Sequence, residues 1–484
     1  MAEFDAIVVG SGPNGLAAAV TLARAGLTVR VYERASTIGG GARTHELTLP
    51  GFRHDVCSAV HPLALASGFF RRFGLERRIR FAVPELSYGH PLDGGRAALA
   101  WRDLDRTAAE LGGDGAAFRR LMGPLVARAD RVAQFVLSTL VRVPPHPVTA
   151  LRFGLRALEQ GSRAWNTRFT RDEAPALLTG VGAHAMTRMP GLAAAGTALS
   201  LAAYAHARGW PIPLGGSQAI VDALADDLLA HGGSIVTDAE VTSLDALPEA
   251  TTVLLDVTPQ AFVRIAGDRV PATYRRRLLR FRHGPAVAKV DFALSAPVPW
   301  GNENLARAGT LHLGGTRAEI ARGEDEVAAG RHPSSPYVLV SQPTVFDPTR
   351  APEGKHVLWA YTHVPQGSSI DRTEAVVQQV ERFAPGFRDV VLASTAMTAL
   401  DVERENPNYV GGDISGGAAS LSQLLARPVL SSEPWRTPVP GLYLCSSSTT
   451  PGPGVHGLSG YYAARAALRH EFGITATPSL APER

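Results

Sequence analysis

A glycine-rich segment near the start of the chain constrains the fold more than any other feature. Residues 10–15 read Gly-Ser-Gly-Pro-Asn-Gly, which matches the pattern Gly-x-Gly-x-x-Gly. The apolar run at 4–9 before it predicts a buried strand, and the alanine-rich run at 16–26 after it predicts a helix. A second apolar run at 28–32 predicts another strand, which Glu33 ends. This order predicts a β-α-β dinucleotide-binding unit.

Each part of this unit has a physical role at a bound dinucleotide. Gly10 permits a tight turn, Gly12 lets the backbone approach a pyrophosphate, and Gly15 lets the helix pack close to the strand. The free N–H groups and the positive end of the helix dipole favour phosphate. Pro13 lacks an N–H, but the first helical turn has donors to spare. Glu33 follows 18 residues after Gly15, where a carboxylate accepts hydrogen bonds from ribose hydroxyls.

Two further segments favour FAD over a nicotinamide dinucleotide. Gly39–Gly41 and Arg43 offer a second close backbone approach with a cation beside it, which suits a long cofactor wrapped from both sides. Near the other end, four glycines within 452–460 separate a predicted strand at 442–445 from a predicted helix at 461–468. A helix N-terminus aimed at a flavin would stabilise the negative charge that reduction creates. We therefore predict that both ends of the chain meet at FAD.

A middle segment completes the nucleotide-binding part. Residues 213–217 lead into a predicted helix at 218–233. Short strands are predicted at 234–237, 241–244 and 252–256. This pattern predicts a second βαβ part of the same sheet.

The chain of 484 residues is too long for one hydrophobic core. We expect an α/β protein with two interleaved domains. The FAD-binding domain is expected from residues 1–70, 213–265 and 437–475, and the substrate domain from residues 71–212 and 266–436.

Composition and spacing exclude several classes of protein. Hydrophobic residues make up 45% and charged residues 19%, as in ordinary globular chains, and the formal net charge is only +4. Cys57 and Cys445 stand outside any CxxC pair, which argues against a disulfide framework or structural zinc and favours the reducing cytoplasm. The first ten residues do not resemble a secretory signal. No helix-turn-helix or zinc-finger spacing indicates nucleic-acid binding.

Three segments bear on contact with a membrane. Residues 189–207 carry no Asp, Glu, Lys or Arg, but barely reach the length of a span of ~20 residues, and we interpret them as a buried helix or helix pair. Residues 132–158 mix apolar side chains with arginines, as in a segment that lies on a membrane surface or one that covers a substrate cavity. The basic run at 275–282 fits either lipid contact or a solvated surface. Peripheral membrane contact therefore stays open.

The blocks GSGPNG at 10–15, residues 33–43, PLGGSQAI at 213–220 and GLYLCSSSTTPGPGVHG at 441–457 share a family pattern. Together they resemble the phytoene desaturase-related FAD-dependent oxidoreductases, most closely the branch of pyridine nucleotide-disulfide oxidoreductase domain-containing protein 2. The resemblance spans nearly the whole chain. It implies a glutathione-reductase-like FAD-binding Rossmann domain, interleaved with a substrate domain of mixed sheet and helices. Carotenoid desaturases of this superfamily act on long polyenes, but this chain departs from them across the substrate domain.

The motifs and the resemblance together assign the cofactor contacts. Some of these contacts, such as Arg34 and Val241, follow from the resemblance alone. The expected FAD-binding residues are Gly10, Gly12, Pro13, Asn14, Gly15, Glu33, Arg34, Gly40, Gly41, Ala42, Arg43, Val241, Gly454, Val455 and His456.

The expected catalytic groups are histidines. Hydride transfer to flavin N5 needs orientation and apolar enclosure, and a desaturation also needs a proton acceptor. His456 lies in the C-terminal glycine motif, where either its ring or only its backbone serves the site, and His61 is a candidate to face the cavity. No spacing suggests a metal site. Four more histidines are each typical of a satisfied buried residue, and two of them side by side would indicate a site: His184, His206, His312 and His363.

The predicted function is oxidation or desaturation of a largely apolar small molecule by hydride transfer to the flavin. Three alternatives stay open: amine oxidase-type C–N oxidation, a redox-neutral flavin-dependent isomerisation, and a flavin-bearing binding protein without turnover. An amine oxidase usually has an aromatic cage, and aromatic residues are only 7% here, which weakens that alternative. No second nicotinamide-binding unit is visible, so oxygen, a quinone or another protein is the expected electron acceptor. The oligomeric state stays open.

Overall fold

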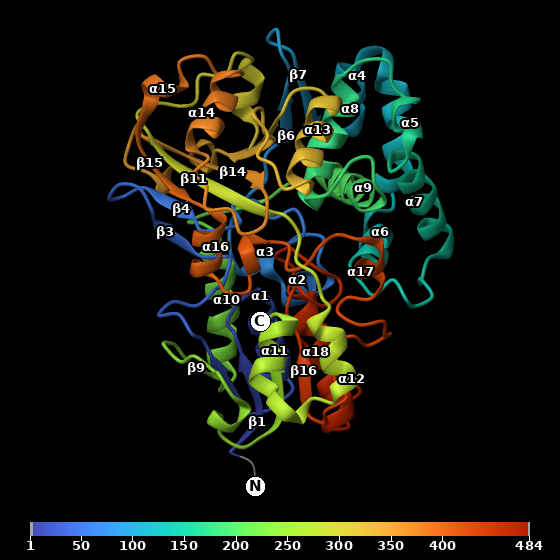
Figure 1. Ribbon diagram of the computed structural model, residues 1–484, viewed down its shortest axis with the longest axis vertical. Helices are drawn as coiled ribbons and strands as arrows, with labels where there is room; N and C mark the ends of the chain where they lie inside the picture. The colour runs from blue at the N-terminus through green and yellow to red at the C-terminus, as the bar shows by residue number, and fades with distance from the viewer. Residues whose placement is uncertain (1–2, 483–484) are drawn as a thin grey trace.

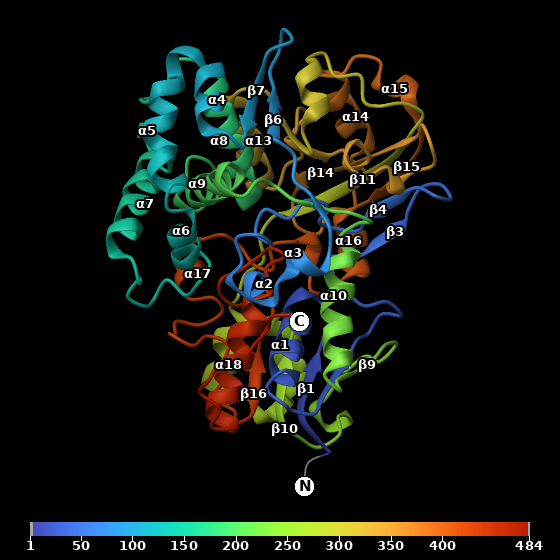
Figure 2. The same ribbon diagram turned by 180° about the vertical axis from the view of Figure 1, so that it is seen from behind.

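The computed structural model describes residues 3–482 (Figures 1 and 2). The lower half in Figure 1 holds a five-stranded sheet in the order β16-β10-β1-β2-β9, and every neighbouring pair in it is parallel. Its strands come from three distant parts of the chain: β1 (Phe4–Val9), β2 (Val29–Tyr32), β9 (Ser234–Val236), β10 (Ala250–Leu255) and β16 (Leu442–Leu444).

Helices cover both faces of this sheet because side chains along a strand alternate between the faces. Ala6 and Val8 of β1 belong to a large core that includes three helices of this half of the molecule, whereas Ile7 and Val9 belong to another core that includes two helices. The first three helices are α1 (Pro13–Ala23), α10 (Gln218–Ala230) and α18 (Leu458–Glu471), and the other two are α11 (Pro259–Ala266) and α12 (Ala272–Leu279). This layering is the predicted Rossmann-type domain.

Glycines permit the close packing of the first and last helices. A Cβ atom on Gly15 would lie 2.0 Å from the carbonyl oxygen of Gly10, so only glycine fits behind the turn. A Cβ atom on Gly460 of α18 would lie 1.7 Å from the carbonyl oxygen of Asn14 in α1. Helices α1 and α18, from opposite ends of the sequence, are therefore in backbone contact.

Two expectations about this domain are corrected. Residues 241–244 form no strand, because the backbone before them hydrogen-bonds to the end of β2: the N–H of Ala239 donates to the carbonyl of Glu33 at 2.9 Å. The chain thus crosses the carboxyl edge of the sheet without pairing along it. Helix α1 begins at Pro13, three residues earlier than expected, and α18 likewise begins early, at Leu458.

The upper half holds a seven-stranded sheet in the order β15-β11-β14-β13-β12-β6-β7, antiparallel except for the β12–β6 pair. On β14, Leu358 and Ala360 join the core that includes residues of α14 and α15, while Trp359 and Tyr361 face the opposite side. The bounds are β6 (Leu86–Pro91), β7 (Ala97–Trp101), β11 (Ala286–Leu294), β12 (Thr310–Leu313), β13 (Val338–Ser341), β14 (His356–Val364), β15 (Val391–Met397), α14 (Thr373–Glu381) and α15 (Phe387–Val390).

A layer of helices stands beside this mixed sheet (Figure 1). It comprises α4 (Leu104–Glu110), α5 (Gly115–Val126), α6 (Ala129–Val136), α7 (Pro147–Gln160), α8 (Glu173–Gly182) and α9 (Leu192–Ala207). The segment 189–207 is mainly the buried helix α9, as predicted. Within residues 3–482, none of the helices has the length and apolar character needed to span a bilayer. The α/β architecture with a dinucleotide-type sheet, a mixed sheet and a helical layer is confirmed.

Candidate functional site

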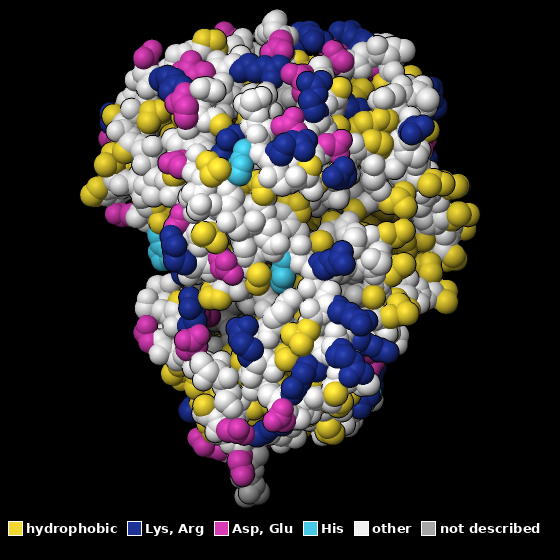
Figure 3. Space-filling model, viewed as in Figure 1, with side chains coloured by type: hydrophobic (Ala, Val, Ile, Leu, Met, Phe, Trp, Pro, Cys, Tyr) yellow, Lys and Arg dark blue, Asp and Glu magenta, His cyan; other side chains and the backbone are white. Residues whose placement is uncertain are grey.

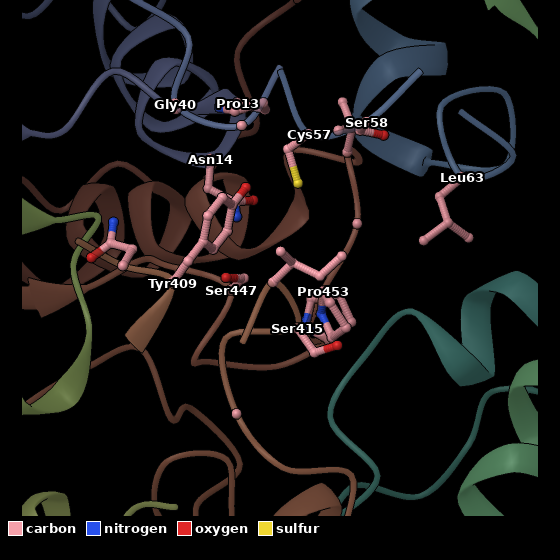
Figure 4. A pocket seen from close by; sticks show the side chains of 18 of the residues that line it. Pro13, Asn14, Gly40, Cys57, Ser58, Leu63, Tyr409, Ser415, Ser447 and Pro453 are labelled. Atoms are coloured by element: carbon pink, nitrogen blue, oxygen red, sulfur yellow. The ribbon is translucent and has the colours of Figure 1, made fainter. Parts of the chain in front are cut away.

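One cavity of about 990 Å³ begins at the carboxyl edge of the parallel sheet and extends to the helical layer. Its nucleotide end is lined by Gly10–Asn14 and Glu33, and its far end by residues of α7 and α9. Figure 4 shows Pro13 and Asn14 from the start of the chain and Ser447 and Pro453 from its end around the same pocket. The predicted meeting of the two chain ends therefore occurs at a cavity.

Thirteen of the fifteen expected cofactor residues line this cavity. The two exceptions are Gly15 and His456. Gly15 lies behind the turn, where its N–H donates to Asp256 Oδ2 at 2.9 Å. Its role is to let α1 approach β1, and the neighbouring residues Gly12–Asn14 form the surface.

The phosphate end has the features of an anion cradle. Gly12 caps the N-terminus of α1 with no side-chain acceptor, so the N–H of Asn14 stays available, whereas Pro13 has no N–H and that of Gly15 donates to Asp256. A Cβ atom on Gly40 would lie 3.2 Å from Gly12 Cα, so two glycine turns face each other closely. Asn14 lines the cavity, and its buried Oδ1 has no hydrogen-bond partner among residues 3–482. These residues fit the pyrophosphate of a dinucleotide.

Glu33 is held in position for a ribose. Its Oε2 accepts hydrogen bonds from Ser11 N at 2.9 Å and Ser11 Oγ at 2.6 Å, and its Oε1 accepts one from Ala35 N at 2.8 Å. A carboxylate offers about four acceptor positions, so one remains for a hydroxyl group. Val241 and Ile265 line the cavity at the same end.

The structure adds Asp256, which the sequence analysis missed. Asp256 follows β10 directly, and its carboxylate lies under the glycine turn, 3.0 Å from where a Cβ atom on Gly12 would be. Burial, together with the nearby Glu33 charge, raises the pKa of Asp256 to about 7, although the Gly15 N–H lowers it. The sequence did show Asp256 at the carboxyl end of a predicted strand. It did not show that this strand, β10, lies next to β1.

His456 does not serve the cavity through its ring, which corrects the expectation of a catalytic role. The ring is fully buried, with Nε2 against the Gly452 carbonyl at 3.1 Å and Nδ1 accepting from Leu458 N at 3.0 Å. Burial lowers the pKa of His456 to about 4, so the ring stays neutral. It braces the turn before α18, while Gly454 and Val455 line the cavity.

His61 lines the cavity, as expected of a candidate, but its ring nitrogens face protein groups. Nε2 lies 2.7 Å from Ser217 Oγ, and Nδ1 lies 3.4 Å from Ser58 Oγ. Burial lowers the pKa of His61 to about 4. The ring thus ties residues 58–61 to the start of α10.

Two of the four remaining histidines do lie side by side. His184 Nε2 and His312 Nε2 are 2.9 Å apart, and His184 lines the cavity. His312 is fully buried, and burial and the neighbouring His184 and His90 rings hold its pKa well below the ordinary value. Since no hydrogen bond to His184 Nδ1 occurs in the described part of the chain, this atom is free to meet a ligand. The pair places a neutral imidazole at the far end of the cavity.

Aromatic rings and a buried cation complete the walls. Trp359 and Tyr361 of β14 line the cavity with ring centroids 5.2 Å apart, nearly perpendicular. Beneath Trp359, the ammonium of Lys289 pairs with Asp291 in a fully enclosed ion pair that the sequence gave no reason to expect. Arg427 also lines the cavity, and its buried guanidinium donates to carbonyl oxygens, including Ser447 at 2.9 Å. No three His, Cys, Asp or Glu side chains within 3–482 cluster as metal ligands.

Known proteins share this architecture. The family model for flavin-containing amine oxidoreductases matches residues 14–468. Pyridine nucleotide-disulfide oxidoreductase domain-containing protein 2 of Rattus norvegicus is 28% identical, covering 96% of this chain and 94% of its own.

Solved structures show the same fold. Putrescine oxidase bound to putrescine aligns with a TM-score of 0.59 at 18% identity, covering 96% of this chain and 99% of that one. Cyclohexylamine oxidase from Brevibacterium oxydans aligns with a TM-score of 0.57 at 14% identity, covering 97% of this chain and 100% of that one. The family match covers most of the chain, and the cradle fits a dinucleotide. The chain therefore belongs to the flavin-containing amine oxidoreductase family and is an oxidoreductase whose cofactor is FAD.

Proposed function

We propose that this oxidoreductase oxidises or desaturates a largely apolar small molecule. The observation that carries the proposal is the contrast between the two ends of one cavity. The four carboxylates that line it, Glu33, Glu240, Asp256 and Glu405, belong to the nucleotide end or to the segment that pairs with Arg43. The helical layer contributes only apolar, small and hydroxyl side chains, such as Phe135, Phe153, Leu192 and Leu201.

This chamber suits hydride removal from a neutral substrate. FAD, when bound, supplies a two-electron acceptor for the hydride. The apolar walls exclude water and orient the substrate, which is the main requirement of such a reaction. We assign His184 to orient the substrate through a hydrogen bond at Nδ1, because it lines the cavity and burial lowers its pKa to about 3, which keeps the imidazole neutral. His312 holds the ring of His184 from behind.

Amine oxidation is the second candidate. The perpendicular pair Trp359–Tyr361 on the cavity wall favours it, and the structural neighbours putrescine oxidase and cyclohexylamine oxidase point the same way. Against it, the helical layer offers no carboxylate to pair with a substrate ammonium. The apolar substrate is therefore the better supported of the two.

Anaerobic reduction of the bound flavin separates these candidates. The FAD-loaded protein is mixed with the lipid-soluble fraction of the cells that contain it, and separately with the aqueous fraction, putrescine and cyclohexylamine. Loss of the yellow absorbance with the lipid-soluble fraction alone supports the proposal. Loss with the amines alone assigns C–N oxidation instead, and no loss with any of them assigns a non-redox role. Reoxidation by oxygen, a quinone or a cell extract then identifies the electron acceptor.

A further inference from the structure

The segment that closes the far end of the cavity carries a large apolar outer surface. Six of the fifteen exposed large hydrophobic side chains in the described chain lie between residues 141 and 158. On α7 they recur at helical spacing, where Val148, Leu151, Leu155 and Leu158 are 61, 63, 59 and 56% exposed. We call these four side chains the outer face of α7. Figure 3 shows apolar side chains gathered on this flank of the molecule.

The inner face of α7 is apolar as well. Ala150, Phe153 and Ala157 are buried, and Phe153 and Ala157 line the cavity. A surface helix normally places its apolar residues only toward the core. An α7 with two apolar faces therefore needs an apolar environment on its outer side too, and a contiguous patch of this kind marks an interaction site.

The charges around the outer face identify the partner. The acidic residue of α7, Glu159, is paired with Arg168 at 2.5 Å, and no acidic residue occurs from Arg131 to Leu158, whereas Arg142 and Arg152 are exposed beside the leucines. Helix α17 (Leu421–Leu425), which lines the same cavity, exposes Leu421 and Leu425. Leucines flanked by arginines match the boundary between the acyl chains and the anionic headgroups of a bilayer.

We propose that the outer face of α7 docks on an anionic lipid bilayer. The contact is peripheral, with the leucines at the acyl boundary and the arginines among the headgroups. Because α7 alone separates this surface from the cavity wall at Phe153 and Ala157, docking places the chamber directly against the lipid. Under the proposed function, an apolar substrate then enters from the bilayer without crossing water.

Vesicle binding tests the docking independently of any reaction. FAD-loaded protein is floated with vesicles of phosphatidylcholine plus phosphatidylglycerol and with vesicles of phosphatidylcholine alone, and the flavin absorbance reports the bound fraction. We expect binding to the anionic vesicles that weakens as salt is raised. The double variant Leu151→Ser/Leu155→Ser should lower the partition coefficient at least tenfold, and Arg142→Gln/Arg152→Gln about fivefold per arginine.

Matched control variants show whether the loss of vesicle binding is specific to α7. Leu229→Ser/Leu392→Ser removes exposed apolar side chains elsewhere, and Arg276→Gln/Arg277→Gln neutralises the other basic segment, on α12. Both should bind like the unmodified protein. The proposal is overturned if the unmodified protein ignores anionic vesicles, or if the α12 variant loses binding while the α7 variants keep it. A dimer that Leu151→Ser/Leu155→Ser converts to monomer, without vesicle binding, would instead assign the face to a second copy of the chain.

Discussion

The Oδ2 atom of Asp256 accepts a hydrogen bond of 2.9 Å from the backbone N–H of Gly15, 241 residues away along the chain. This contact joins the carboxyl end of β10 to the first turn of α1, at the surface where the cofactor pyrophosphate is expected. A carboxylate there would repel the phosphates, whereas a neutral carboxyl group would not. The raised pKa of Asp256, about 7, reconciles the acidic residue with an anion site.

Replacing Asp256 tests this account. The pKa of the folded state lies above that of the unfolded chain, 3.8, so the folded protein holds a proton that the unfolded chain releases. Stability of the apoprotein therefore falls as pH rises from about 4 to about 7. Asp256→Asn should remove this loss and stabilise the apoprotein above pH 7 by roughly 1–4 kcal/mol, as measured by urea unfolding. FAD affinity should fall above pH 7 in the unmodified protein and stay flat in the variant, and equal pH profiles would contradict the assignment.

A pair of substitutions tests the approach of two loops at the cofactor. A Cβ atom on Gly41 would lie 1.8 Å from Tyr409 Oη. Gly41→Ala should therefore displace the Tyr409 ring into the cavity and lower FAD content several-fold. Tyr409→Phe removes the clashing oxygen, so the double variant should recover part of the bound flavin. Gly196→Ala, at a cavity-lining glycine with open space around its added Cβ atom, is the matched control and should retain FAD.

Removing His184 tests its assignment as a group that orients the substrate. His184→Phe should slow flavin reduction by the active cell fraction about tenfold, because the loss of a neutral hydrogen bond costs about 1.4 kcal/mol. His312→Phe, which removes only the support behind the ring, should slow it less. FAD content and thermal unfolding temperature should change little in His184→Phe. An equal fall in FAD content would show that the ring is structural.

Replacing Arg427 tests how the C-terminal part of the chain holds the cavity wall in place. Its buried guanidinium donates to the carbonyls of Ser415, Gly416 and Ser447, and burial lowers its pKa to about 10, so it remains charged at neutral pH. Arg427→Lys keeps the charge but lacks the planar donors that reach these carbonyls. We expect a loss of ~2–4 kcal/mol in unfolding free energy and faster FAD release. The exposed Arg280→Lys should cost less than ~0.5 kcal/mol.

The local sequence was sufficient to predict the cofactor site wherever a motif acts through its backbone. The turn at 10–14, Glu33 at the end of β2 and Gly454 near the C-terminus all line the cavity, because turn geometry, close backbone approach and the end of a strand are encoded by neighbouring residues. The strand predicted at 241–244 does not form, because the position of this segment is set by a contact that is distant in sequence. Its course depends on a hydrogen bond from Ala239 to Glu33, two residues more than 200 positions apart.

Side-chain roles required the tertiary structure. His456 belongs to a predicted site motif, yet both nitrogens of its ring hydrogen-bond to the backbone of the turn that it stabilises. His184 and His312 have no motif, and only the packing of α8 and its following turn against β12 brings their rings together. The sequence by itself determined the cofactor-binding domain, since backbone conformations are local. The substrate chamber, its imidazole pair and the exposed face of α7 were decided by tertiary packing, because each depends on which distant surfaces cover one another.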